Sequence, residues 1–199
     1  MRLLPLCLAP LLMLNVAAQS APAPVPSAFT TAPDGRTLVH VESGTRFPKK
    51  LGGFERTGQA AFDGSGEYVG VAYRGALDDG SPVTIRIAIV HIVGMTAMEH
   101  FIIAKPLVLK DLANVEEVSA GPYERPGKGV DGYMGMFNAE DAGQKVGIGL
   151  WTFDRGYWSV RGRVEFPQGR LKESQAAVDK FVRAFVALRQ PYKTPPNAR

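Results

Sequence analysis

The fold is decided by the stretch EYVGVAYRGALDDGSPVTIRIAIVHI, residues 67–92. Apolar side chains alternate with others in residues 67–74 and again in residues 83–92, which is the period of a β-strand. Between the two segments, Asp79-Gly80 tolerates the positive φ of a tight hairpin turn. Both faces of the second strand carry apolar side chains. We therefore expect an antiparallel hairpin whose second strand is central in a sheet covered on both sides.

The same period of two recurs on either side of this hairpin. It predicts further strands at residues 36–42, 54–62, 115–123, 130–138, 145–153 and 157–166. A turn at Asp154-Arg-Gly156 joins the last two strands into a second hairpin. Because consecutive hairpins place neighbouring strands antiparallel, we expect a mostly antiparallel sheet of about six to eight strands.

Two segments have the spacing of helices. Thr96 and Glu99 form a capping box, after which apolar residues recur at helical spacing. These apolar residues are Met98, Phe101, Ile102, Leu109 and Leu112. Pro106 lies within this segment and is expected to kink the helix or split it. Residues 171–188 carry one apolar face and predict a second helix, so the fold class is α+β with two helices packed on the sheet.

The N-terminus has the pattern of a secretory signal peptide over residues 1–18. Arg2 precedes a short apolar run, and Val16 and Ala18 supply the small residues of a cleavage site near Ala18. The run is too short to cross a bilayer. Residues 19–27 form a Pro/Ala-rich linker, 28–189 a single domain and 190–199 a flexible tail. We therefore expect a periplasmic or secreted protein with no transmembrane segment after processing.

Cleavage would remove Cys7, the only cysteine, so the mature protein is expected to contain no disulfide. Its core would instead be built from ten Phe, six Tyr and two Trp, all of which lie after residue 18. Loss of the single charge on Arg2 lowers the formal net charge from +4 to +3. The charges are dispersed along the chain, which argues against nucleic acid as a partner.

Three segments carry a resemblance to known proteins: SGTRFPKKLGGFER (residues 43–56), GEYVGVAYR (66–74) and GYWSVRGRVEFP (156–167). Together they resemble a family of uncharacterised exported proteobacterial proteins. That family has a "G-x-x-FP" start, "GF-x-R", a "VxVxY" strand and a late "W-x-x-K/R-x-R" strand. The order of elements also resembles the PsbP-type α/β/α sandwich, a fold used mostly for docking onto other proteins. The resemblance implies this architecture and brings no activity with it.

No segment has a catalytic motif. Gly127 to Gly132 matches G-x-G-x-x-G, but it leads into a strand where a dinucleotide site needs a helix, so a turn is expected there. His40, His91 and His100 are not accompanied by a G-x-S-x-G elbow. We therefore predict no catalytic residues and no cofactor.

The sequence contains no metal-binding motif either. Met95, Met98, Met134 and Met136 are soft side chains that could bind copper(I), although methionine is also a common core filler. The acidic turns at residues 63–67 and 78–80 do not have the ligand spacing of an EF-hand. We predict no metal, with a copper carrier as a weaker alternative.

Candidate binding residues lie on the strands of the second hairpin. Arg161 and Arg163 share one strand face with Tyr157 and could form a fork for a carboxylate or phosphate, or could simply pair with neighbouring acids. Gly147 and Gly149 share one face of their strand, and Gly70 and Ala72 share one face of a strand in the first hairpin. Glycine weakens a strand, so its repeated use indicates a close approach to the backbone, either by the kinked helix or by a ligand in a groove.

These observations lead to one main hypothesis for function. We expect an exported, non-catalytic binding or accessory protein of the cell envelope, whose partner is another envelope protein or a small anionic ligand. The alternative is an exported hydrolase without a recognisable motif, which would require a His, Asp or Ser constellation in a pocket. A periplasmic copper-binding protein is the weaker alternative.

Overall fold

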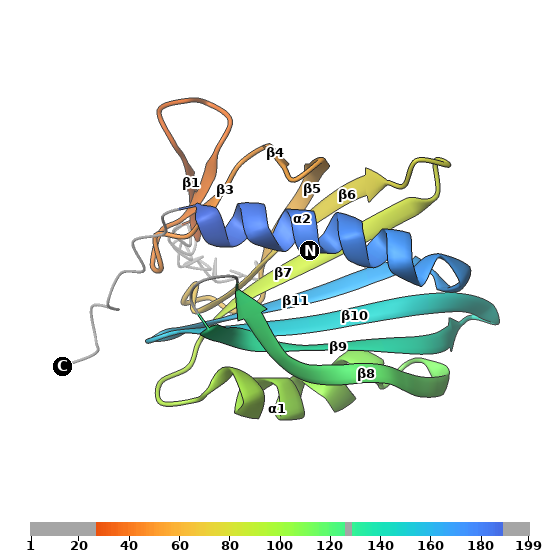
Figure 1. The fold of residues 1–199 in the computed structure, drawn as a ribbon. Helices are drawn as coiled ribbons and strands as arrows, with labels where there is room; N and C mark the ends of the chain where they lie inside the picture. The colour runs from red at the N-terminus through yellow and green to blue at the C-terminus, as the bar shows by residue number, and fades with distance from the viewer. Residues whose placement is uncertain (1–26, 126–128, 189–199) are drawn as a thin grey trace, which may run out of the picture.

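The chain forms a large antiparallel sheet with one helix on each face (Figure 1). The structure is a computed structural model that describes residues 27–125 and 129–188. The strand order of the sheet is β4-β5-β6-β7-β11-β10-β9-β8. Its strands are β4 (Lys50–Leu51), β5 (Phe54–Ala61), β6 (Tyr68–Ala76), β7 (Pro82–His91), β8 (Ala113–Arg125), β9 (Gly129–Asp141), β10 (Gln144–Arg155) and β11 (Trp158–Pro167). The predicted α+β class and its mostly antiparallel sheet are confirmed.

A second, small antiparallel sheet precedes the large one. It consists of β1 (Phe29–Thr31), β2 (Leu38–His40) and β3 (Arg46–Phe47). The strand predicted at residues 36–42 is β2 and belongs to this small sheet, so its expected place in the main sheet was wrong. The strands β1, β3 and β4 were not predicted, because two or three residues are too few to show a period of two.

The hairpin of residues 67–92 is present as β6 and β7. Gly80 has a φ of 84° at its turn, and β7 lies between β6 and β11 in the middle of the sheet. Ile85, Ile87 and Ile89 are fully buried on the face that packs against the helix α2 (Leu171–Ala187). The opposite face of β7 is only partly covered, because Arg86 is exposed there. The expectation that β7 is covered on both sides is therefore only half right.

The main core lies between the sheet and α2. The second predicted helix is confirmed, and four of its apolar residues are buried against the sheet: Val178, Phe181, Val182 and Phe185. Both tryptophans, Trp151 and Trp158, are buried in the same layer. The described residues contain no cysteine, so hydrophobic burial in this aromatic layer, and not a disulfide, stabilises the part of the chain that the structure describes.

The helix α1 (Ala97–Leu109) packs on the other face of the sheet. Its capping box is confirmed: the Glu99 N–H donates to Thr96 Oγ1 (3.2 Å), and the Thr96 N–H donates to Glu99 Oε2 (2.8 Å). The helix continues past Pro106, so the expected split does not occur.

The face of α1 that packs inward matches the predicted one only in part: Phe101 and Leu109 are buried as predicted. Met98 and Ile102 are 51 % and 60 % exposed, whereas His100, Phe101 and Ala104 are buried. Because residues 101–109 are apolar on nearly every side, helical spacing does not select one face of this segment. No helix among residues 27–125 and 129–188 is both long and apolar enough to span a membrane.

The predicted signal peptide, almost all of the linker, and the C-terminal tail lie outside the described residues. The first residues of the G-x-G-x-x-G match also lie outside them. Its later residues, from Gly129 onward, belong to β9, as the turn-into-strand interpretation expects.

Candidate functional site

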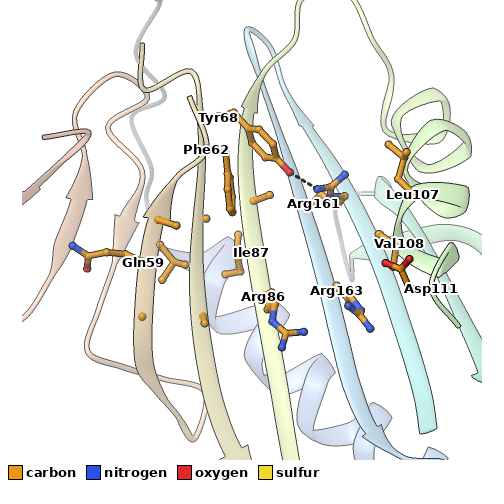
Figure 2. Close-up of a pocket in the computed structure, with 16 residues that line it drawn as sticks. Gln59, Phe62, Tyr68, Arg86, Ile87, Leu107, Val108, Asp111, Arg161 and Arg163 are labelled. Atoms are coloured by element: carbon orange, nitrogen blue, oxygen red, sulfur yellow. Dashed lines mark hydrogen bonds between the residues drawn. The ribbon is translucent and has the colours of Figure 1, made fainter. Parts of the chain in front are cut away.

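One face of the large sheet is only half covered by its helix. The helix α1 packs against β9, β10 and β11. A helix with its side chains is about 10 Å across and strands lie ~4.8 Å apart, so one helix covers only two or three strands. Beside α1, over β5, β6, β7 and β11, lies a cavity of about 410 Å³ (Figure 2).

The floor of the cavity consists of small residues on three neighbouring strands. In the strand register, Gly58 of β5 is opposite Ala72 of β6, and Ala60 is opposite Gly70. Gly70 is in turn opposite Ala88 of β7. Directly opposed residues of antiparallel strands project to the same face, so these five residues form a shallow apolar surface.

Larger side chains enclose this floor from two sides (Figure 2). Phe62 and Tyr68 stand together at one side, with ring centroids 4.5 Å apart. The Phe62 ring lies over Gly70, where a Cβ atom would be 2.7 Å from the ring. Leu107 and Val108 of α1 line the opposite side. The cavity is therefore apolar along its floor and at two walls.

Three arginines line the same cavity: Arg86 on β7, and Arg161 and Arg163 on β11. Arg163 is directly opposite Arg86 in the register, an arrangement of like charges that destabilises a sheet unless it is neutralised. Glu165 lies close to both, with Oε2 at 3.3 Å from Arg163 Nη2 and 3.6 Å from Arg86 Nη1. The buried Arg163 Nε–H has no acceptor among the described residues. One carboxylate is thus shared by two guanidinium groups.

Arg161 has a different environment. Its Nη2 donates to the Tyr68 hydroxyl at 2.8 Å, and no ion pair among residues 27–125 and 129–188 involves it. The charge of Arg161 also acts on His100, which is 4 % exposed. Burial, and to a lesser extent the charge of Arg161, lower the pKa of His100 to about 4. No carboxylate of the described residues therefore forms an ion pair with Arg161.

The three histidines do not form one catalytic constellation. His100 Nδ1 is hydrogen-bonded to Ser159 Oγ, but both residues are buried. His40 Nε2 donates to the Gly66 carbonyl at 2.7 Å, so its Nδ1 is unprotonated in the neutral ring and accepts from Ser43 Oγ at 2.7 Å. This residue is fully buried, and burial lowers its pKa.

The remaining histidine, His91, has Nδ1 at 3.3 Å from Glu67 Oε1. Each histidine therefore has a hydroxyl or carboxylate neighbour. The histidines are not isolated, and the hydrolase alternative stays a prediction. None of the three lines the cavity.

The structure brings together some of the predicted binding residues and separates others. Arg161 and Arg163 line the cavity, together with Gly70 and Ala72. Tyr157 lies in the turn before β11 and does not line the cavity.

Gly147 and Gly149 lie on the α2 face of β10, away from the cavity. A Cβ atom on Gly147 would be 2.1 Å from the Phe166 ring, and one on Gly149 would be 3.2 Å from Met136 Sδ. Other atoms do approach the backbone of these glycines closely, as inferred. The approaching groups are core side chains, whereas α1 and a ligand groove were expected. A ligand-binding role for any of the predicted residues stays a prediction.

The four methionines of the copper alternative lie on opposite faces of the sheet. Met98 is on the exposed side of α1, and Met95 is in the segment before it. Met134 and Met136 belong to the core on the α2 side. The four sulfur atoms therefore do not share one site. No group of three or more His, Cys, Asp or Glu side chains in the described part of the chain is placed to hold a metal ion.

Arg86 is the arginine of the cavity that the sequence did not indicate. It alternates with isoleucines within β7, so it carries the ordinary signal of a solvent-facing strand position. Only the pairing of β7 with β11 places it beside Arg163. Leu107 and Val108 were likewise unpredicted, because the sequence does not show where the C-terminal end of α1 lies relative to the sheet.

Comparison with known proteins gives no family for this chain. No family model and no curated protein matches it. Seven chains of solved structures match, among them cyanobacterial PsbP (CyanoP) from Synechocystis sp. PCC 6803, determined in solution. The two chains are 10 % identical with a TM-score of 0.46, over 85 % of this chain and 96 % of that one. At this level the similarity says nothing about function, and the resemblance to exported proteobacterial proteins stays a prediction.

Proposed function

We propose that this protein is an exported, non-catalytic binding protein of the cell envelope, and that the cavity beside α1 is its site for a small anion. The observation that supports this proposal is the gathering of Arg86, Arg161 and Arg163 around a cavity where one carboxylate, Glu165, is shared by two of them. Guanidinium groups bind carboxylates and phosphates through paired N–H donors.

The chemistry of the lining favours binding over catalysis. Guanidinium groups stay protonated and the Tyr68 hydroxyl already accepts from Arg161, so these groups position an anion without removing a proton from it. A hydrolase would need a nucleophile held beside a base in the cavity. Asp111 is the one carboxylate among the described residues that line the cavity, and no His, Ser or Cys lines it with Asp111. His100 and Ser159 are both buried and do not line the cavity.

The binding site can be tested with the simplest anions. The side-chain Nε–Hε NMR signals of Arg161 and Arg163 are expected to shift and saturate as sodium acetate is added at constant ionic strength. Loss of one charge-assisted hydrogen bond costs ~1.5–3 kcal/mol, so Arg161→Gln should weaken acetate binding by roughly 10- to 100-fold. Arg183→Gln, on an exposed position of α2, is the matched control and should bind like wild type.

Two results would overturn this assignment. The first is a linear, unsaturated shift of all arginine signals, which would indicate general ionic effects. The second is a loss of binding in Arg183→Gln equal to that in Arg161→Gln.

Export requires its own measurement. Mass spectrometry of cell fractions is expected to find a mature chain that begins after Ala18 in the periplasm or medium. An intact chain that starts at Met1 and stays in the cytoplasm would refute the export part of the proposal.

A further inference from the structure

We infer that the anion bound at this cavity is a singly charged carboxylate that carries an apolar body. This inference rests on the proposed function and specifies its ligand class. The carboxylate would bind beside Arg161, and the apolar body would lie on the floor of small residues toward Phe62 and Leu107 (Figure 2).

The charges around the cavity favour one negative charge on the ligand. Arg86, Arg161 and Arg163 contribute three positive charges, while Glu165 neutralises part of the Arg86 and Arg163 pair. Asp111 lines the cavity at the α1 side and adds a second negative charge. The remaining excess is one positive charge. A dianion such as a phosphate monoester would bring a surplus negative charge near Glu165 and Asp111.

The apolar lining favours a ligand larger than a simple anion. Phe62 and Leu107 flank the floor, and each is 57 % exposed. On the cavity face of β5 and β6, the lining positions other than Tyr68 are occupied only by Gly58, Ala60, Gly70 and Ala72. A bare carboxylate would leave this surface exposed to water, whereas an apolar body would cover it. The cavity volume of about 410 Å³ lies within the ~300–1,000 Å³ range of small-molecule sites.

The geometry of the floor explains why these residues are small. The Phe62 ring already touches the position that a Cβ of Gly70 would occupy. A larger side chain at Ala72, whose neighbours across the strands are Gly58 and Arg86, would project into the space above the floor. The small residues therefore keep the space between Phe62 and α1 open.

The test compares four probes that differ in charge and in apolar body: acetate, octanoate, octan-1-ol and octyl phosphate. Calorimetric titration of the mature protein at pH 7.5 gives their affinities. Each buried methylene is worth roughly a fourfold change in affinity, so burial of four methylenes predicts octanoate binding ~10²-fold tighter than acetate. Octan-1-ol and octyl phosphate, the latter mostly a dianion at this pH, should both bind more weakly than octanoate.

Variants locate the apolar body. Ala72→Leu would fill the space above the floor and should reduce octanoate binding at least tenfold while acetate binding changes less than threefold. Ala61→Leu, on β5 but outside the cavity lining, is the matched control. If Ala72→Leu does not fold, as judged by circular dichroism, Leu107→Ser tests the exposed wall and should reduce octanoate binding severalfold.

The possible outcomes separate the two proposals. Equal affinities for acetate and octanoate, both lost in Arg161→Gln, would uphold an anion site and refute the apolar body. Tighter binding of octyl phosphate than of octanoate would refute the single charge. No saturable binding of any probe would refute both this inference and the proposed function.

Discussion

Acidification is expected to destabilise this protein through His100. The imidazole is buried between α1 and the sheet, and its pKa in the folded protein is about 4 against 6.5 for an ordinary histidine. Protonation therefore favours the unfolded chain, in which the ring is solvated. The stabilising contribution of neutral His100 is fully present above pH 6.5 and decreases as the pH falls toward 4.

The magnitude follows from the two pKa values. At pH 5 the unfolded histidine is almost fully protonated and the folded one is mostly neutral, which gives a linkage free energy of about 2 kcal/mol relative to pH 7. Solvent screening and relaxation of the nearby Arg161 side chain reduce this value, so we expect a measured loss of about 1 kcal/mol. The expected loss is a large fraction of the stability of a domain this size.

The assay is urea denaturation of wild type and His100→Gln at pH 7 and pH 5. Glutamine keeps a hydrogen-bonding group near Ser159 but does not titrate. The pH dependence of the variant's unfolding free energy therefore comes from the other titratable groups. These include His40, because burial lowers its pKa, and Asp179, because burial raises its pKa. Wild type should lose ~1 kcal/mol more than the variant on going from pH 7 to pH 5.

Two findings would refute this account of His100. The first is an equal pH dependence of the unfolding free energy in both proteins. The second is an NMR titration in which the His100 ring changes its protonation near pH 6.5. A related NMR titration of Arg161→Gln should show a higher pKa for His100 than in wild type, because one positive charge has been removed. That pKa should stay below the ordinary value, because burial is the larger cause.

Three further substitutions have outcomes that the packing predicts. Gly162→Ala should destabilise the protein by ~3 kcal/mol or more in chemical denaturation, because the new Cβ would lie 2.0 Å from the buried Trp151 ring. Thr96→Ala should lower the unfolding free energy by ~1 kcal/mol through loss of the capping box with Glu99, whereas Thr96→Ser should be nearly neutral in the same assay. Phe181→Ala removes a fully buried ring and should cost ~3–5 kcal/mol, seen as a lower melting temperature, and an unchanged melting temperature would contradict the assigned core.

The parts of the fold that sequence could predict are those with long, regular patterns. The strands β6 to β11 each span nine or more residues, and α2 has one clear apolar face, so period alone indicates them. The face of α1 was predicted only in part, with Met98 and Ile102 wrongly placed inward, because its sequence is apolar on most sides. Its orientation is fixed by contacts of Phe101 and Ala104 with the sheet, which are long-range and leave no local signal.

The candidate site illustrates the same limit. Arg161 and Arg163 could be chosen from sequence because they lie two apart on one strand. Arg86 could not, because the pairing of β7 with β11 that places it opposite Arg163 joins distant segments of the chain. The sequence also indicated that glycines in strands permit a close approach, but it could not identify what approaches.

The two faces of the sheet show what distinguishes those glycines. On the α2 face, Gly147 is directly opposite Phe166 and Gly162 is directly opposite Trp151, and in both cases the aromatic ring covers the glycine. These glycines make room for a ring within the core, and filling them is expected to cost stability.

On the α1 face, the small residues of β5 and β6 lie beside the cavity. Gly58, Ala60 and Ala72 line an open cavity, and Phe62 covers only Gly70. A cross-strand ring therefore accounts for Gly147 and Gly162 on the α2 face, whereas no such ring accounts for Gly58, Ala60 and Ala72 beside the cavity. The absence of a covering side chain at these three positions, beside three arginines, is the physical reason for placing a ligand on this face and not on the other.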